Sequence, residues 1–171
     1  MKKIIATIIV AAIYAFADPI SGGFGIKLGD TFDPKQAVKV TKTTSGEPLY
    51  GVRPPKKVKY FDQYYVMITP KSHKIREIWG IGRYAKREEC MKDFETLSIL
   101  LSKKYGELKK PAIISMDEIL STSDGDRSVS IRCSGMMSYH LYLKYISEKL
   151  NDLAAQERAE METKKIDTDA L

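Results

Sequence analysis

The alternation of apolar and polar residues predicts two β-hairpins. In residues 60–69, Tyr64, Val66 and Ile68 share one face, and the other face carries Phe61, Tyr65 and Met67. This period of two is typical of a strand. Residues 70–74 predict a turn, and residues 75–84 a returning strand with Ile75, Trp79 and Ile81 on one face. Residues 128–133 and 138–146 alternate in the same way around a break at Ser134-Gly135, which predicts the second hairpin.

A period of 3.6 predicts two helices. In residues 86–105 the apolar positions Cys90, Phe94, Leu97 and Leu101 follow the spacing of one buried stripe, and Gly106 is a typical C-cap. A second helix is expected from Glu148 to about Lys165, with an apolar stripe that fades after Ala155.

The element order after an N-terminal segment is therefore β-β-α-β-β-α. We expect an α+β fold in which an antiparallel sheet of two β-hairpins carries helices packed on one face. Residues 18–165 have the length of a single domain, and residues 166–171 are expected to form a disordered tail. Before the first hairpin, Asp33 is expected to cap a short helix over residues 34–40, and residues 41–58 are expected to be loop with a short strand at 49–52.

Gly80 and Gly82 fall on the same face of the predicted strand as Ile78. Small residues at alternate positions indicate that another backbone, for example a packed helix, approaches the sheet closely there.

The first seventeen residues have the organisation of a secretory signal peptide. Lys2 and Lys3 precede an apolar run over residues 4–16, and Ala15-Phe16-Ala17 matches the small-x-small cleavage pattern. The alternative is an uncleaved anchor, but a spanning helix needs about 20 residues, more than this run provides. We expect cleavage after Ala17, no stable membrane anchor thereafter, and a periplasmic or secreted protein.

The chain has two cysteines, Cys90 and Cys133, and both fall on predicted core faces. Exported proteins fold in an oxidising compartment, so we expect one disulfide rather than two buried thiols. A helix packed on the sheet would bring the two side chains together. The bridge closes a loop of about 44 residues, which loop-entropy arguments value at roughly 4 kcal/mol.

The charge is basic in the body of the chain and acidic at its end. Residues 18–171 hold 26 basic and 22 acidic side chains, a net charge of +4, whereas residues 148–171 alone carry −3. A basic body suits anionic partners such as lipopolysaccharide, a membrane surface or an acidic protein, but an ordinary solvated lysine surface is the favoured explanation, because most lysines simply keep a surface hydrated. Nucleic acid is not expected as a partner, because the leader directs export and no nucleic-acid-binding motif is present.

No catalytic, metal or cofactor motif is present in the sequence. His73 and His140 stand apart from any metal-ligand spacing, no serine lies in a G-x-S-x-G pattern, and the predicted bridge removes the thiols. Gly23-Phe24-Gly25 and Gly80-Ile81-Gly82 lack the rest of a phosphate-binding motif. We expect no catalytic residues, no metal and no cofactor.

Aromatic residues concentrate in the two hairpins, and a basic stretch over residues 53–59 precedes the first. Such rings either fill the core or form a binding face with large contact area. Both strand faces are apolar, which favours core for part of the set. The candidate binding surface consists of Tyr60, Tyr64, Trp79, Arg53, Lys56 and Lys57.

The leader, the run from Gly25 to Phe32, the run from Tyr64 to Pro70, Cys90 and Lys104-Tyr105-Gly106 together resemble small exported proteobacterial proteins. The resemblance extends over residues 1–106 and implies export. It implies no activity and no site residues.

Three functions stay open. The first is a non-enzymatic binding protein of the bacterial envelope or medium, with a protein or an envelope component as its partner. The second is an inhibitor of an exported hydrolase, such as a protease or lysozyme, that uses residues 41–59 or 70–74 as a plug. The third is a hydrolase whose site draws on scattered residues such as His140 and Asp117.

Overall fold

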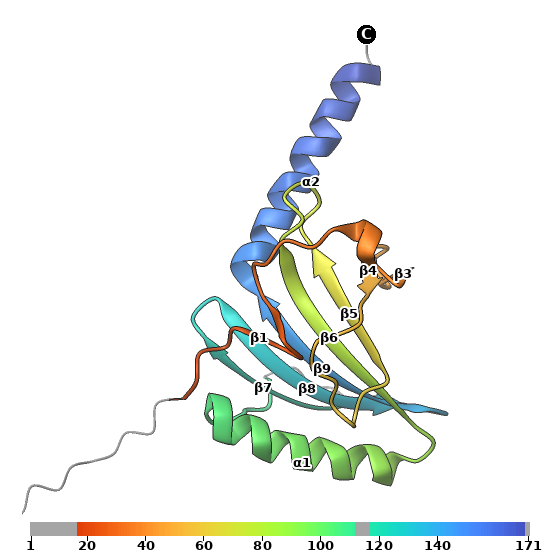
Figure 1. Ribbon diagram of the computed structural model, residues 1–171, viewed down its shortest axis with the longest axis vertical. Helices are drawn as coiled ribbons and strands as arrows, with labels where there is room; N and C mark the ends of the chain where they lie inside the picture. Colours follow the sequence, from red (N-terminus) through yellow and green to blue (C-terminus); the bar gives the residue numbers. More distant parts are fainter. Residues whose placement is uncertain (1–16, 112–116, 170–171) are drawn as a thin grey trace, which may run out of the picture.

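The computed structural model describes residues 17–111 and 117–169, with side chains as far as residue 164. The predicted leader therefore lies almost wholly outside the described residues, as does part of the stretch after Pro111. The fold is α+β, with a seven-stranded antiparallel sheet, a two-stranded sheet and two α-helices in the described ranges (Figure 1).

The large sheet has the strand order β3-β4-β5-β6-β9-β8-β7. Its strands are β3 (Lys39–Lys42), β4 (Pro48–Gly51), β5 (Gln63–Ile68), β6 (Ile75–Tyr84), β7 (Glu118–Asp124), β8 (Arg127–Gly135) and β9 (Tyr139–Ser147). The small sheet pairs β1 (Gly22–Gly23) with β2 (Ile26–Lys27).

The predicted hairpins are β5–β6 and β8–β9, and the pairing of β6 with β9 joins them. The sheet is wider than the sequence predicts, because β3 and β4 extend it on one side and β7 on the other. β3 is exposed throughout and β7 is rich in hydroxyl side chains. Neither edge strand has the buried alternation that marks a strand in a sequence.

The helix α1 (Arg87–Tyr105) covers one face of this sheet (Figure 1). Its predicted stripe is buried and packs into the main core with Val129, Ile131 and Leu143. Cys90 and Cys133 form the expected disulfide, with their Cα atoms 6.2 Å apart. The bridge therefore ties α1 to β8.

Two face assignments made from the sequence are wrong. Ile75 lies in the main core with Ile78 rather than with Trp79, because the register of β5 and β6 shifts between Met67 and Ile68. Phe61 also lies in the main core, since it precedes β5 and does not follow its alternation.

The N-terminal segment covers the rest of the core face. Phe24 packs edge-on against Tyr64, with ring centroids 4.9 Å apart, and its ring occupies the space above Gly80. A Cβ on Gly82 would lie 2.1 Å from the carbonyl oxygen of Tyr60. The close approach predicted for these glycines is confirmed, but a ring and a loop make it, not a helix.

The helix α2 (Glu148–Asp169) follows β9 directly and projects beyond the sheet (Figure 1). Its helical turns continue past Lys165, into the segment expected to be tail. Glu157 anchors it: the carboxylate accepts hydrogen bonds from the Lys71 amide at 2.7 Å and the Ser72 hydroxyl at 2.6 Å. In the described part of the chain, no helix has the length and apolar character needed to cross a membrane.

The short helix before β3 is shorter than predicted. Asp33 caps a 3-10 helix over Pro34–Gln36, accepting a hydrogen bond from the Lys35 amide at 2.9 Å. The chain then enters β3 at Lys39, where the sequence predicted the end of a helix and the start of a loop.

Candidate binding face

The residues of the predicted binding surface lie on different parts of the molecule. Tyr64 belongs to the main core, and its hydroxyl bonds the amide and the carbonyl of Val58, at 2.9 and 3.0 Å. Tyr60 is half-buried and packs against the same core, whereas Trp79 points to the opposite face of the sheet.

The basic loop is exposed, as a solvated loop is expected to be. Arg53 and Lys57 line a cavity of about 300 Å³ that Tyr64 also borders. Lys56 does not line this cavity, and its amide donates to the carbonyl of Phe24 at 3.0 Å. The structure thus groups three of the six predicted residues and leaves Trp79 apart from them.

Trp79 belongs instead to the face of the sheet opposite α1, which we call the open face. The strand register places one line of residues across all seven strands of this face. We call this line the cross-sheet row, and it consists of Lys39, Gly51, Tyr65, Trp79, Lys144, Ser130 and Ser121. At about 4.8 Å between strands, the row is roughly 29 Å long.

Cations lie on the aromatic rings of the open face. The Lys144 ammonium is 3.5 Å from the centroid of the Trp79 ring, and the Lys39 ammonium is 4.9 Å from that of Tyr65. In the neighbouring row the Arg132 guanidinium carbon lies 4.8 Å from the centroid of Tyr142. Each distance falls in the range of a cation–π contact. Three cations and three rings are therefore paired on one surface.

Gly51 makes one of these pairs possible. It stands between Lys39 and Tyr65 in the row. The Lys39 side chain passes over Gly51, through the space that a side chain at this position would fill. A Cβ on Gly51 would lie 2.7 Å from Cγ of Lys39. The absent side chain thus lets the lysine reach the ring.

Hydrogen bonds hold two of the rings in place. The Trp79 indole N–H donates to a Glu77 oxygen at 2.8 Å, and the Tyr65 hydroxyl donates to the Gln63 amide oxygen at 2.6 Å. The same Gln63 oxygen accepts from the Lys39 ammonium at 3.1 Å. The rings and their cations are therefore positioned before any ligand arrives.

The Lys144 ammonium is incompletely hydrated. Burial lowers the pKa of Lys144, the nearby Glu77 carboxylate acts in the opposite direction, and the Arg132 charge lowers the pKa further. A charged group in such a position interacts strongly with an incoming anion, because less water must be displaced.

The β7–β8 side of the open face carries hydroxyl groups. Ser121, Ser123, Ser128 and Ser130 line a concavity of about 920 Å³ that reaches Ile146 on β9. Ser130 also borders a smaller hollow with Arg132, Tyr142 and Lys144. Hydroxyls both donate and accept hydrogen bonds, so this side suits a polar ligand.

Sequence reasoning missed Arg132, Tyr142 and Lys144. The signal was present, since all three occupy the positions that alternate with the predicted core residues of their strands. In the sequence they have the pattern of residues on the solvated side of a sheet. Only the strand register of the structure shows that they lie beside Trp79.

The described residues contain no group of three His, Cys, Asp or Glu side chains placed to hold a metal ion. The chain matches no protein-family model. No curated protein and no solved structure matches it either.

Proposed function

We propose that this chain is a non-enzymatic binding protein of the bacterial envelope or medium, and that the open face binds an anionic carbohydrate polymer. The observation that carries the proposal is the cross-sheet row, in which Lys39 and Lys144 lie on the rings of Tyr65 and Trp79.

The charge of the face favours an anionic ligand. Lys39, Arg132 and Lys144 present cations, and Arg83 stands at the same face opposite His140. The carboxylate of Glu77 is already engaged by Trp79 and by Arg76. The remaining positive charge is available to attract an acidic partner.

The shape and chemistry of the face favour a sugar polymer. A sugar ring has an apolar C–H face that packs on an aromatic ring, and hydroxyls that bond to serine and amide groups. The open face offers the partly exposed rings of Trp79 on β6 and Tyr142 on β9, and hydroxyls on β7 and β8, whereas the Tyr65 ring on β5 is buried under Lys39. A row of roughly 29 Å is long enough to contact several sugar units in succession.

Export is the second part of the proposal. The disulfide between Cys90 and Cys133 supports an oxidising compartment, and the leader pattern supports a periplasmic or secreted protein.

The sole tryptophan of the chain, Trp79, allows a direct test. Titration with polygalacturonate is expected to change Trp79 fluorescence saturably, with an affinity that falls as salt rises. Lys144→Ala should weaken binding at least tenfold, whereas Lys92→Ala, which removes an exposed cation from α1, should not. Equal responses to polygalacturonate and to neutral dextran would contradict the proposal.

A second candidate function is inhibition of an exported hydrolase. The turn between β8 and β9 presents Met136 and Met137 with exposures of 92% and 97%. Exposed apolar side chains at a hairpin tip suit insertion into an apolar enzyme subsite. The expected plug at residues 70–74 is less suited, because Glu157 holds that turn against α2. A hydrolase panel assayed with the protein and with Met136→Ser/Met137→Ser tests this candidate.

A further inference from the structure

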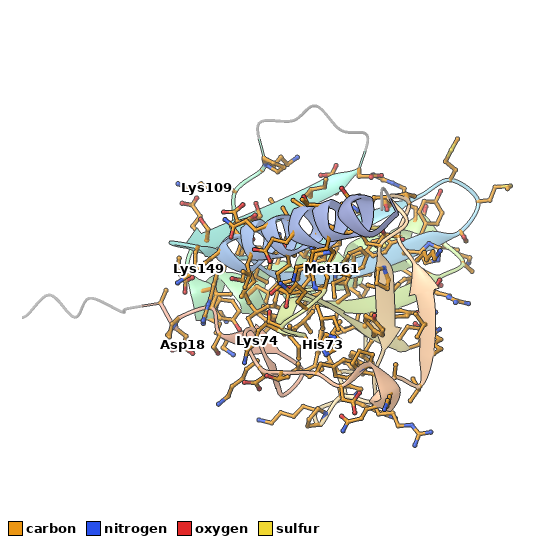
Figure 2. The ribbon with its side chains drawn as sticks, turned by 90° about the horizontal axis from the view of Figure 1, so that it is seen from above. Asp18, His73, Lys74, Lys109, Lys149 and Met161 are labelled. Atoms are coloured by element: carbon orange, nitrogen blue, oxygen red, sulfur yellow. A yellow bond between two sulfur atoms is a disulfide. The ribbon has the colours of Figure 1, made fainter. Side chains whose placement is uncertain are left out.

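A separate cavity lies at the end of the molecule from which α2 projects. It has a volume of about 330 Å³ and is enclosed by the β3–β4 turn, the β5–β6 turn and α2. Figure 2 looks onto this end and labels His73 of the β5–β6 turn and Met161 of α2. The volume lies in the range of small-molecule sites, about 300 to 1,000 Å³.

Arg76 is the buried cation of this cavity, with 5% of its surface exposed. One terminal nitrogen donates to the Asn151 side-chain oxygen at 2.7 Å and to Glu77 at 3.4 Å, and the other donates to Glu47 at 2.8 Å. Its Nε is buried and has no hydrogen-bond partner among the described residues. A buried unpaired N–H is rare in folded proteins.

Arg158 adds a second cation at the mouth of the cavity. Its guanidinium donates to the Glu47 oxygen that Arg76 also uses, so two cations share one carboxylate oxygen. The Arg158 side chain is 42% exposed. Since a guanidinium has five N–H donors, Arg158 keeps donors available for another anion.

The remaining walls combine one imidazole with apolar groups. His73 has a φ of 51°, in the left-handed region, and its backbone amide bonds the Thr69 carbonyl at 3.2 Å. This conformation places the side chain among the lining residues, with Tyr50 and Ile68 also in the wall. A non-glycine residue in this region is uncommon and is found preferentially at functional positions.

We infer that this cavity binds a small organic carboxylate with an apolar body. The carboxylate bonds to Arg158 and His73 beside the buried charge of Arg76, and the apolar body packs on Tyr50 and Ile68. The site is distinct from the open face and does not depend on the function proposed for it.

The test uses the full mature chain and two probes, hexanoate and phenylacetate, followed by NMR of the His73 imidazole and by the melting temperature. Saturable shifts of the His73 signals and a rise in melting temperature are expected for both acids. Hexanamide and phenylacetamide, which have the same bodies without the charge, should produce neither effect.

Variants complete the test. Arg158→Ala should raise the dissociation constant at least tenfold, whereas Lys149→Ala, an exposed cation on the same helix, should leave it unchanged. Lys144→Ala on the open face should also leave it unchanged. If Arg158→Ala does not fold, the acid–amide comparison on the unaltered chain decides. Absence of saturable shifts, equal shifts with the amides, or binding of inorganic phosphate alone would overturn the inference.

Discussion

The Lys144 ammonium lies 3.5 Å from the centroid of the Trp79 ring, on the sheet face opposite α1. The two residues face each other directly across β6 and β9. A lysine on an ordinary solvated face extends its ammonium into water, which hydrates it strongly. Here the ammonium lies on an indole whose N–H is bound to Glu77, so both groups are held in position.

Replacing Lys144 by Met is expected to raise the melting temperature near neutral pH while removing polyanion binding. Burial lowers the pKa of Lys144, so between that lowered pKa and 10.5 the unfolded chain binds more protons than the native chain. Stability therefore rises with pH across that window, and the charged form opposes folding below it. Thermal unfolding at pH 7 and pH 10 measures both effects, with Lys92→Met as the control. A lower melting temperature for Lys144→Met would contradict this explanation.

Gly51→Ala is expected to displace Lys39 from Tyr65. The added Cβ would lie 2.7 Å from Cγ of Lys39 and 3.2 Å from its carbonyl oxygen, so the lysine side chain must move and β3 must shift slightly against β4. We expect a stability change below about 1.5 kcal/mol together with a several-fold weaker affinity for polygalacturonate. Denaturant unfolding and the Trp79 titration measure the two quantities. Unchanged affinity would show that Lys39 does not take part.

The double variant Cys90→Ala/Cys133→Ala is expected to lose about 2 to 4 kcal/mol of unfolding free energy. The bridge joins α1 to β8 across the core, and both cysteines are buried. Urea unfolding of the variant and of the oxidised protein gives the difference. Reduced protein without the substitutions should behave like the variant, and a loss well below 1 kcal/mol would mean that packing alone holds α1.

The attachment of α2 is expected to weaken in acid. Burial raises the pKa of Glu157, but hydrogen bonds from the Ser72 hydroxyl and from the Lys71 and Ser72 amides outweigh it and hold the pKa below 4.5. The stabilisation is therefore present above pH 4.5 and is lost as pH falls through the lowered pKa. Hydrogen exchange of α2 should accelerate over that range.

Glu157→Gln provides the comparison for that experiment. It should show fast exchange of α2 already at pH 7 and a weaker dependence on pH, with roughly 1 to 2 kcal/mol less stability. Glu162→Gln, an exposed position on the same helix, should match the unaltered chain. Slow exchange in Glu157→Gln would mean that other contacts hold α2.

Periodicity was sufficient to predict the central strands and α1, and together with the export pattern of the leader it predicted the disulfide. Tyr64 and Val66 alternate with Tyr65 and Met67 as the sequence indicates, and Cys90 faces Cys133 because both belong to regular buried patterns. The edge strands β3 and β7 were not predicted, because their exposed polar residues show no alternation of apolar and polar positions. The face of Ile75 was assigned wrongly because a register shift is not visible in one strand alone.

The candidate site was harder to predict than the fold. Trp79 was identified, but its partners lie on strands far along the chain and meet it only through the pairing of β6 with β9. The cavity beside Arg76 depends on three segments that come together at one end of the molecule. Such convergence is a property of tertiary structure, whereas a sequence pattern reports local neighbours.

The residues on the two faces of β8 have different roles. Cys133, bridged to α1, points inward, and the adjacent residue Arg132 points outward onto Tyr142. The outward guanidinium is in this way carried by a strand that a covalent bond fixes from beneath.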